Sequence, residues 1–240
     1  MCGIVTAIAR RNIVPVLLEG LRKLEYRGYD SAGLAVLKDG KLQRLRAVGR
    51  VAELAAQADA THLSAEIGIA HTRWATHGVP SERNAHPHIS AGLAVVHNGI
   101  IENFEELRTQ LRAKGYEFTS ETDTEAIAHL LHDTLKTTPD LFEAVRITLG
   151  QLIGAYAIGV VSEAEPNRAI VARKGSPLLL GIGEDGHYAA SDTAALLQVT
   201  RKVVYLEDGD VAELRLDGYR VTLQDGTPVE RAVNISSLSA

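Results

Sequence analysis

Cys2 is the only cysteine of the sequence, and it stands next to the start of the chain. If Met1 is removed, the thiol nucleophile and a free α-amine share one residue. The amine can then take the thiol proton near neutral pH, because the two reference pKa values are close, at about 8.5 and about 8. We interpret Cys2 as a candidate nucleophile that carries its own base. A small buried apolar residue near the terminus is the alternative.

Three other segments could hold a substrate next to such a nucleophile. Arg73, beside Trp74, could clamp a carboxylate through two parallel hydrogen bonds, or lie on the surface without a ligand. Asn98 and Gly99 offer a side-chain amide and a backbone N–H, the donors of an oxyanion hole, although the same pair forms ordinary turns. Asp123 could bind an ammonium group or cap a helix.

A group of histidines between residues 71 and 97 raises a second kind of chemistry, metal binding. Its members are His71, His77, His86, His88 and His97. They contain no His-x-x-x-His pair, and no acidic residue completes a familiar ligand spacing. A glycine-rich phosphate loop is also missing from the sequence. We therefore predict neither a metal nor a cofactor.

The candidate residues need elements that position them, and the hydrophobic pattern supplies these. An apolar run over residues 2–9 predicts a buried strand that begins at Cys2, and apolar residues at helical spacing predict a helix over 14–24. Strands over 67–70 and 93–96 are expected to end in the polar loops 71–78 and 97–99. The polar, glycine-containing segment 26–33 predicts a loop.

The remaining pattern predicts the fold class. Further helices are expected over 51–60, 102–114, 122–135 and 141–152, with a short one over 193–197. Strands are expected at 34–37, 42–48, 155–161, 169–173, 178–182, 188–190, 203–206, 211–216 and 219–223. The Asp39-Gly40 pair predicts a hairpin. Strands at both ends of the chain with helices between them favour an α+β fold in which helical layers enclose two antiparallel sheets.

Composition restricts the class of function. The chain has 240 residues, 45% of them hydrophobic, which suffices for one large domain over residues 1–240. Its net charge of −5 and the lack of a basic run argue against nucleic acid and anionic membranes as partners. No apolar stretch reaches the ~18 residues of a membrane span, and the arginines at 10 and 11 follow the first apolar run instead of preceding it. We expect a cytoplasmic location.

Taken together, the motifs resemble the glutamine amidotransferase (type 2, glutaminase) domain of the N-terminal nucleophile class, which begins Cys-Gly-Ile. Three segments are similar to its glucosamine-6-phosphate synthase branch: Leu-Glu-Tyr-Arg-Gly-Tyr-Asp-Ser-Ala-Gly at 24–33, His-Thr-Arg-Trp-Ala-Thr-His-Gly at 71–78 and Val-His-Asn-Gly-Ile-Ile-Glu-Asn at 96–103. The resemblance extends over essentially all 240 residues. It implies a four-layer αββα sandwich.

The resemblance also implies roles for the candidate residues. Cys2 would attack glutamine and form a thioester, with Asn98 and Gly99 stabilising the oxyanion. Arg73 and Asp123 would hold the substrate carboxylate and ammonium.

The loop over the substrate would be lined by Trp74, Thr76 and His77.

Two sugar-isomerase domains, which bind fructose 6-phosphate in the full-length, homodimeric enzymes of this branch, are absent from the 240 residues. A catalytically silent regulatory domain and another N-terminal nucleophile amidohydrolase are the alternatives.

Overall fold

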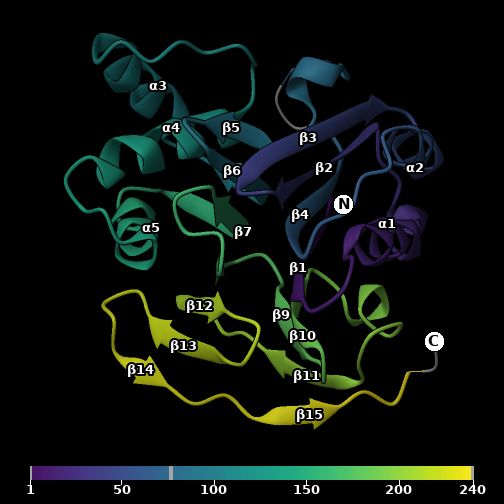
Figure 1. The fold of residues 1–240 in the computed structure, drawn as a ribbon. Coiled ribbons are helices and arrows are strands. Elements are labelled where there is room, and N and C mark those ends of the chain that lie inside the picture. Colours follow the sequence, from purple (N-terminus) through teal and green to yellow (C-terminus); the bar gives the residue numbers. More distant parts are fainter. Residues whose placement is uncertain (1, 76–77, 239–240) are drawn as a thin grey trace.

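The computed structural model describes residues 2–75 and 78–238, and this part of the chain forms two antiparallel sheets (Figure 1). The first sheet has eight strands, in the order β15 (Val233–Ile235), β11 (Lys202–Tyr205), β9 (Leu179–Ile182), β10 (Gly186–Ala190), β1 (Gly3–Ala9), β4 (Ile67–Arg73), β2 (Ser31–Lys38) and β3 (Lys41–Val48). The second has seven, in the order β14 (Pro228–Val229), β13 (Tyr219–Leu223), β12 (Asp210–Leu214), β8 (Ala169–Lys174), β7 (Gly154–Ser162), β6 (Leu93–Ile101) and β5 (His88–Ser90).

Helices cover the outer face of each sheet. The five α-helices of the described residues are α1 (Val14–Lys23), α2 (Val51–Ala60), α3 (Phe104–Ala113), α4 (Asp123–Leu135) and α5 (Leu141–Leu149). Single 3₁₀ turns lie at Glu25–Arg27, Glu82–Asn84 and Thr193–Ala195. Helix α1 contacts β1 and β4, whereas α4 contacts β5 and β6. Among these helices none has both the length and the apolar character that crossing a bilayer would require.

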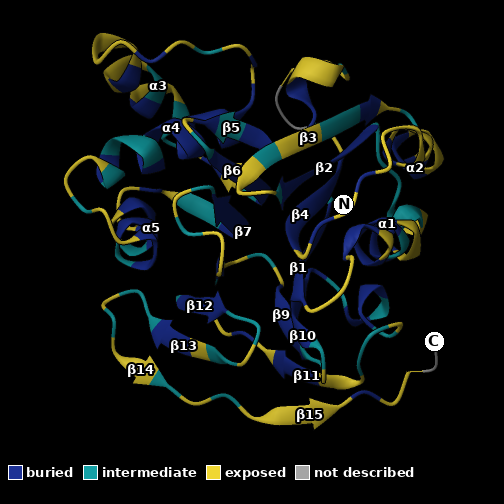
Figure 2. Cartoon of the chain, in the orientation of Figure 1, coloured by how far each residue is buried: buried dark blue, intermediate teal, exposed yellow. Residues whose placement is uncertain are grey.

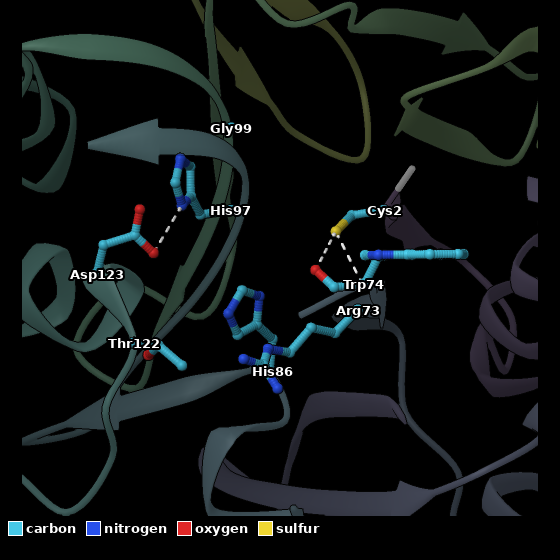
Figure 3. A pocket seen from close by; sticks show the side chains of 8 residues that line it. All are labelled: Cys2, Arg73, Trp74, His86, His97, Gly99, Thr122 and Asp123. Atoms are coloured by element: carbon cyan, nitrogen blue, oxygen red, sulfur yellow. Dashed lines mark hydrogen bonds and ion pairs between the residues drawn. The ribbon is translucent and has the colours of Figure 1, made fainter. Parts of the chain in front are cut away.

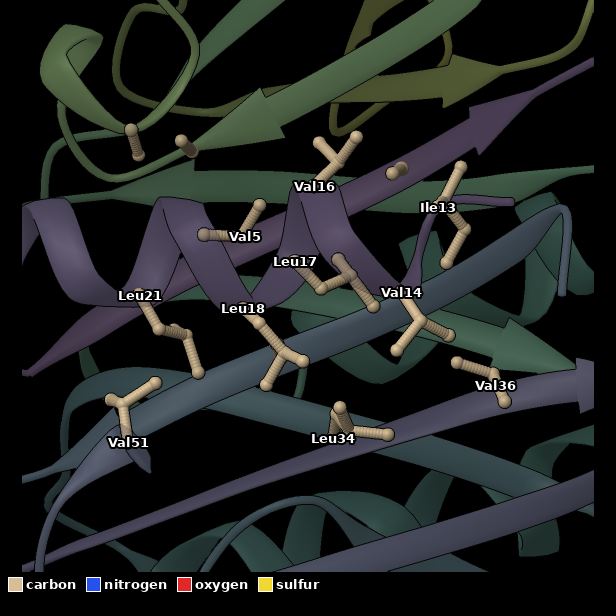
Figure 4. Packing of buried hydrophobic residues seen from close by; sticks show 14 of the residues in the cluster. Val5, Ile13, Val14, Val16, Leu17, Leu18, Leu21, Leu34, Val36 and Val51 are labelled. Carbon is tan, nitrogen blue, oxygen red and sulfur yellow. The ribbon is translucent and has the colours of Figure 1, made fainter. Parts of the chain in front are cut away.

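Strand β1 is covered on both faces, so the first sheet has a layer on each side. Every residue from Gly3 to Ala9 is buried, so both faces of the strand are covered. Val5 and Ala7 pack in a cluster with α1, while Ile4 and Ile8 alternate with them and pack in the cluster between the sheets. Figure 4 shows the α1 side of this arrangement, and Figure 2 shows the inner strands buried and β15 exposed at the edge.

Three hydrophobic clusters separate the four layers. Leu17 and Leu21 of α1 pack on the first sheet. Ile69 and Val96 belong to the cluster between the two sheets, and Phe142 of α5 belongs to the cluster on the second sheet. The α+β class and the αββα sandwich predicted from the sequence are therefore confirmed.

The hairpin predicted at Asp39-Gly40 is confirmed. Strands β2 and β3 pair up to Lys38 and Lys41, so the two intervening residues form the tight turn. Both have positive φ, 52° at Asp39 and 73° at Gly40, as a type I′ turn requires.

The predicted ends of two strands were wrong. Strand β4 continues through His71 to Arg73, and β6 continues through Asn98 and Gly99 to Ile101. These polar residues therefore lie inside ladders, with Asn98 opposite Ala157 of β7, and not in loops. The polar side chains are buried where other elements can hydrogen-bond them, which a polarity pattern alone cannot reveal.

Smaller predictions also needed correction. Residues 26–33 are not all loop, because the 3₁₀ turn Glu25–Arg27 includes the first two of them and β2 begins at Ser31. The short helix expected over 193–197 is a 3₁₀ turn, Thr193–Ala195. The short strands β5, β14 and β15 were not predicted. They pair along only two or three residues, too few for a clear alternating pattern.

Candidate active site

The position of Cys2 is fixed by strand β1, which lies in the middle of the first sheet between β10 and β4. The N–H of Gly3 donates to Thr72 Oγ1 at 3.0 Å, and the N–H of Ile4 donates to Ser191 Oγ at 3.0 Å. A Cβ atom at Gly3 would lie 2.7 Å from both Leu24 and Thr72. The backbone that follows Cys2 is therefore held on both sides.

The thiol of Cys2 contacts the backbone of Trp74. The N–H of Trp74 donates to Sγ at 3.1 Å, and the thiol donates to the Trp74 carbonyl oxygen at 3.6 Å. Burial raises the pKa of the Cys2 thiol above its usual range, and the hydrogen bond from Trp74 opposes this shift. In this environment the thiol is largely protonated at neutral pH, so it needs a base to become a nucleophile.

Trp74 itself is 55% exposed and lies over Gly28. A Cβ atom at Gly28 would come within 2.5 Å of the indole ring, and the φ of Gly28 is +73°. Gly28 therefore provides the space for the ring.

Asn98 and Gly99 lie in β6, which belongs to the second sheet, yet both reach the Cys2 region. Asn98 Nδ2 donates to the backbone oxygen of Cys2 at 3.1 Å. Gly99 has a φ of +118°, and a Cβ atom there would lie 2.1 Å from the Ala155 carbonyl oxygen. A side chain at position 99 is thus excluded by both backbone conformation and space.

Asp123 is the first residue of α4, with Thr122 as the N-cap. One of its oxygens, Oδ2, accepts a hydrogen bond from the N–H of Ile101 at 2.9 Å, and Oδ1 lies 3.8 Å from His97 Nδ1. The Asp123 carboxylate is buried and lines a pocket that Cys2 also lines.

Arg73 ends β4 and is only 3% exposed. Its guanidinium donates to the carbonyl oxygens of Gly78 at 3.2 Å and Val79 at 3.4 Å, and lies 3.7 Å from Asp30 Oδ1. The side chain is thus positioned by the segment that follows β4 and by the residue that precedes β2.

These residues surround one small pocket. It is lined by Cys2, Arg73, Trp74, His86, His97, Gly99, Thr122 and Asp123. Figure 3 shows Cys2 and Asp123 on opposite sides of it. A carboxylate at one end and a thiol at the other suit a ligand with an ammonium group and a reactive carbonyl.

A wider groove of about 1010 Å³ also contains Cys2, and Ile100, Ser176 and Pro177 lie along it. The structure brings together six of the eight predicted site residues around these two spaces. The other two, Thr76 and His77, lie outside the described residues.

Sequence reasoning missed Asp30, which holds the segment after β4. Its Oδ2 accepts a hydrogen bond from the N–H of Ala75 at 2.5 Å, and its own N–H donates to the Arg73 carbonyl oxygen at 2.7 Å. The polar segment 26–33 marked the region, but not the contact with residues more than forty positions away.

His71, His86 and His88 are buried, and burial lowers the pKa of His71 and His88 to about 3 and that of His86 well below its usual range. All three are therefore neutral near pH 7. Over residues 2–75 and 78–238, no group of three or more His, Cys, Asp or Glu side chains is arranged to hold a metal ion.

Comparison with known proteins gives consistent relatives. A family described as the glutamine amidotransferase domain matches residues 71–198. The glutamine–fructose-6-phosphate aminotransferase (isomerizing) of Acidithiobacillus ferridurans is 59% identical over 242 residues, covering 100% of this chain and 40% of the relative. The protein of the same name from Xanthomonas campestris is 57% identical, covering 100% of this chain and 39% of the relative.

Solved structures share the fold. A glutamine phosphoribosylpyrophosphate amidotransferase from B. subtilis superimposes with a TM-score of 0.79 at 27% identity, covering 93% of this chain and 49% of that one. A glutamine aminotransferase class-II domain protein from Silicibacter pomeroyi gives a TM-score of 0.63 at 14% identity, covering 93% of this chain and 99% of that one. At that identity the likeness concerns the fold alone.

Proposed function

Since the chain belongs to the glutamine amidotransferase domain family, we propose that it hydrolyses the side-chain amide of L-glutamine to glutamate and ammonia. The observation that carries the proposal is that Cys2, Arg73 and Asp123 line one small pocket. A thiol can attack the amide, while a guanidinium and a carboxylate can bind the two charged groups of an amino acid.

Substrate recognition divides between the two charged side chains. Arg73 binds the α-carboxylate of glutamine, and Asp123 binds its α-ammonium. The buried position of Asp123 supports this role, because an ammonium group would compensate the carboxylate in a site from which water is largely excluded. We propose that Trp74, Thr76 and His77 also contribute to substrate binding.

The reaction proceeds through a covalent intermediate. After Met1 removal, the α-amine of Cys2 accepts the thiol proton, and Sγ attacks the amide carbon. The tetrahedral oxyanion accepts hydrogen bonds from Asn98 Nδ2 and the N–H of Gly99. The C–N bond then breaks, and the proton passes to the leaving nitrogen, which departs as ammonia. Water activated by the same amine attacks the thioester carbon, and the C–S bond breaks to release glutamate and the thiol.

The chain spans about two fifths of the length of the curated relatives described above. We propose that it is the glutaminase part of a larger cytoplasmic, homodimeric enzyme. In that enzyme the ammonia would convert fructose 6-phosphate to glucosamine 6-phosphate at sugar-isomerase domains outside these 240 residues. The relatives' names and their high identity to this chain support this assignment.

The test compares substrates with the purified chain after intact mass has confirmed that Met1 is absent. Glutamate release from L-glutamine is expected, with little hydrolysis of propionamide, which lacks both groups that Arg73 and Asp123 bind. No turnover of either compound would indicate a silent regulatory domain. Equal hydrolysis of both would indicate a different amidohydrolase.

A second assay addresses the proposed division of labour between domains. Given glutamine and fructose 6-phosphate, this chain should release ammonia to solvent and form no glucosamine 6-phosphate. Formation of the amino-sugar phosphate would show that the sugar site lies within the 240 residues.

A further inference from the structure

A buried histidine of the first sheet contacts the Asn98 amide of the second. His71 lies in β4 opposite Ile4 of β1, and its side chain is fully buried. Its Nε2 atom lies 3.0 Å from Asn98 Oδ1 and 2.9 Å from the backbone oxygen of His97. His71 therefore reaches across from the sheet of the nucleophile to the strand that carries Asn98.

These contacts fix which ring nitrogen of His71 carries the hydrogen. The His97 carbonyl oxygen can only accept a hydrogen bond, so Nε2 must donate. The imidazole stays neutral near pH 7, because burial lowers the pKa of His71 to about 3. Nδ1 then carries no hydrogen, and in the described residues this buried atom has no hydrogen-bond partner. The single hydrogen of Nε2 is shared by the two nearest acceptors, the His97 carbonyl oxygen and Asn98 Oδ1, as a bifurcated hydrogen bond. His86 Nδ1, 3.2 Å from the same Nε2, carries no hydrogen that would oppose it.

The tautomer of His71 in turn fixes the orientation of the Asn98 amide. A donor at Nε2 requires the nearby amide atom to be the oxygen, so the NH₂ group faces the other way, toward Cys2. There, Nδ2 donates one hydrogen to the Cys2 carbonyl oxygen at 3.1 Å and has a second to offer. A flipped amide would place its NH₂ group against the N–H of His71 and its oxygen against the Cys2 carbonyl oxygen.

We infer that His71 is a positioning residue for glutamine hydrolysis, which holds the Asn98 amide with its N–H donors directed at the site where the oxyanion forms. This inference rests on the proposed function, in which Asn98 stabilises that oxyanion. His71 does not itself line either pocket, but it contacts Asn98, His97 and His86, which do. Of these three, only Asn98 is proposed to donate to the oxyanion, so His71 acts on that donor through Asn98.

The main variant is His71→Phe, which keeps an aromatic ring but removes the Nε2 donor. Loss of an oxyanion donor typically costs about 10²- to 10³-fold in kcat, and a misdirected donor costs part of that. We expect kcat to fall roughly 10- to 100-fold, with KM changed less than about threefold, because the oxyanion exists only in the transition state. An unchanged kcat would overturn the inference.

A pair of amide variants covers the case in which His71→Phe does not fold. The side-chain nitrogen of glutamine can reach the place of Nε2, whereas that of asparagine is too short. His71→Gln should therefore retain a higher kcat than His71→Asn. Equal values, or a higher kcat for His71→Asn, would contradict the assignment.

A double variant separates positioning from general damage. In the Asn98→Ala background, His71→Phe should lower kcat no further, because the group that it positions is already gone. Full additivity of the two losses would show that His71 acts by another route. Alkylation of Cys2 by iodoacetamide, which needs no oxyanion hole, should proceed at the same rate in His71→Phe as in the unchanged chain.

His187→Phe is the matched control, because it also replaces a buried histidine by phenylalanine. His187 pairs with Ile8 of β1, which lies five residues beyond Gly3 and thus about 16 Å from the Cys2 end of the strand. The kcat of the His187→Phe variant should therefore not change. The unchanged chain separates the two proposals. If it releases no glutamate, the proposed function fails, whereas an active chain with an equally active His71→Phe variant removes only the inference on His71.

Discussion

The Sγ atom of Cys2 lies 3.1 Å from the backbone nitrogen of Trp74 and 3.6 Å from its carbonyl oxygen. The nucleophile proposed here thus contacts the backbone of the segment that follows Arg73. The N–H of Trp74 can stabilise a thiolate, whereas the carbonyl oxygen favours the thiol. The protonation state of Cys2 is therefore coupled to the position of this segment.

We predict that Met1 removal lowers the pKa of the Cys2 thiol. Burial raises the pKa while Met1 is attached, so the thiolate, which is the reactive form, accumulates only at alkaline pH. A free α-ammonium next to the thiol favours the thiolate and shifts its formation to lower pH. The rate of Cys2 alkylation by iodoacetamide, measured between pH 6 and 10, should show a lower midpoint for the processed chain. Coincident profiles would contradict this prediction.

Met1 removal should also decide whether glutamine is hydrolysed. Retained Met1 turns the Cys2 amine into an amide nitrogen, which cannot accept a proton near neutral pH. Glutamate release should therefore come only from the processed form, with both forms checked by intact mass. Comparable turnover by the unprocessed chain would mean that another residue, such as a histidine near the site, is the base.

Asn98→Ala should lower kcat roughly 10²- to 10³-fold and change KM much less, because an oxyanion donor acts mainly on the transition state. Steady-state glutamate release measures both constants. Asn234→Ala serves as the control, because Asn234 is exposed in the edge strand β15. If Asn98→Ala keeps its full turnover, Asn98 has no part in the reaction.

Asp123→Asn should raise KM for glutamine about 10- to 100-fold at similar kcat, because a hydrogen bond to a charged group contributes about 1.5–3 kcal/mol in both ground and transition states. Asparagine keeps an oxygen that can accept from the N–H of Ile101, so the helix start is preserved.

A substrate analogue provides the control for Asp123. Glutaramate, which lacks the α-ammonium, should be hydrolysed with a similar kcat/KM by the unchanged chain and by Asp123→Asn. A variant that discriminates against both compounds equally would assign Asp123 a role other than ammonium binding.

The buried histidines should make the protein sensitive to acid. The pKa values of His71 and His88 are about 3 in the folded state, that of His86 is also well below its usual range, and unfolded histidine titrates near 6.5. The unfolded state therefore binds more protons below pH 6.5, so the free energy of unfolding falls as the pH falls. Each histidine contributes up to about 1.4 kcal/mol per pH unit.

Urea unfolding at pH 7.5, 6 and 5 measures this dependence. The variant His86→Leu removes one of the three groups and should show a shallower decline of the unfolding free energy with falling pH. Parallel declines in the two proteins would mean that His86 is not kept neutral by the fold.

The sequence by itself determined the layers of this protein. The continuous apolar run behind Cys2 predicted a buried strand, and the structure confirms it as β1, with every residue from Gly3 to Ala9 buried. Helical spacing predicted α1, α2 and α4 within a residue or so at each end. These features depend on local periodicity, because an element must direct its apolar face to a core whatever else surrounds it.

Only the tertiary structure decided how the polar residues meet. Asn98 and Gly99 resembled a turn because their polarity interrupts the apolar pattern, yet both lie inside β6. Asn98 also donates a hydrogen bond to the backbone oxygen of Cys2. The partners of Asn98, His71 and Cys2, are 27 and 96 positions away in the sequence. Such contacts follow from the packing of two sheets face to face, and a local pattern cannot encode which side chains that packing places together.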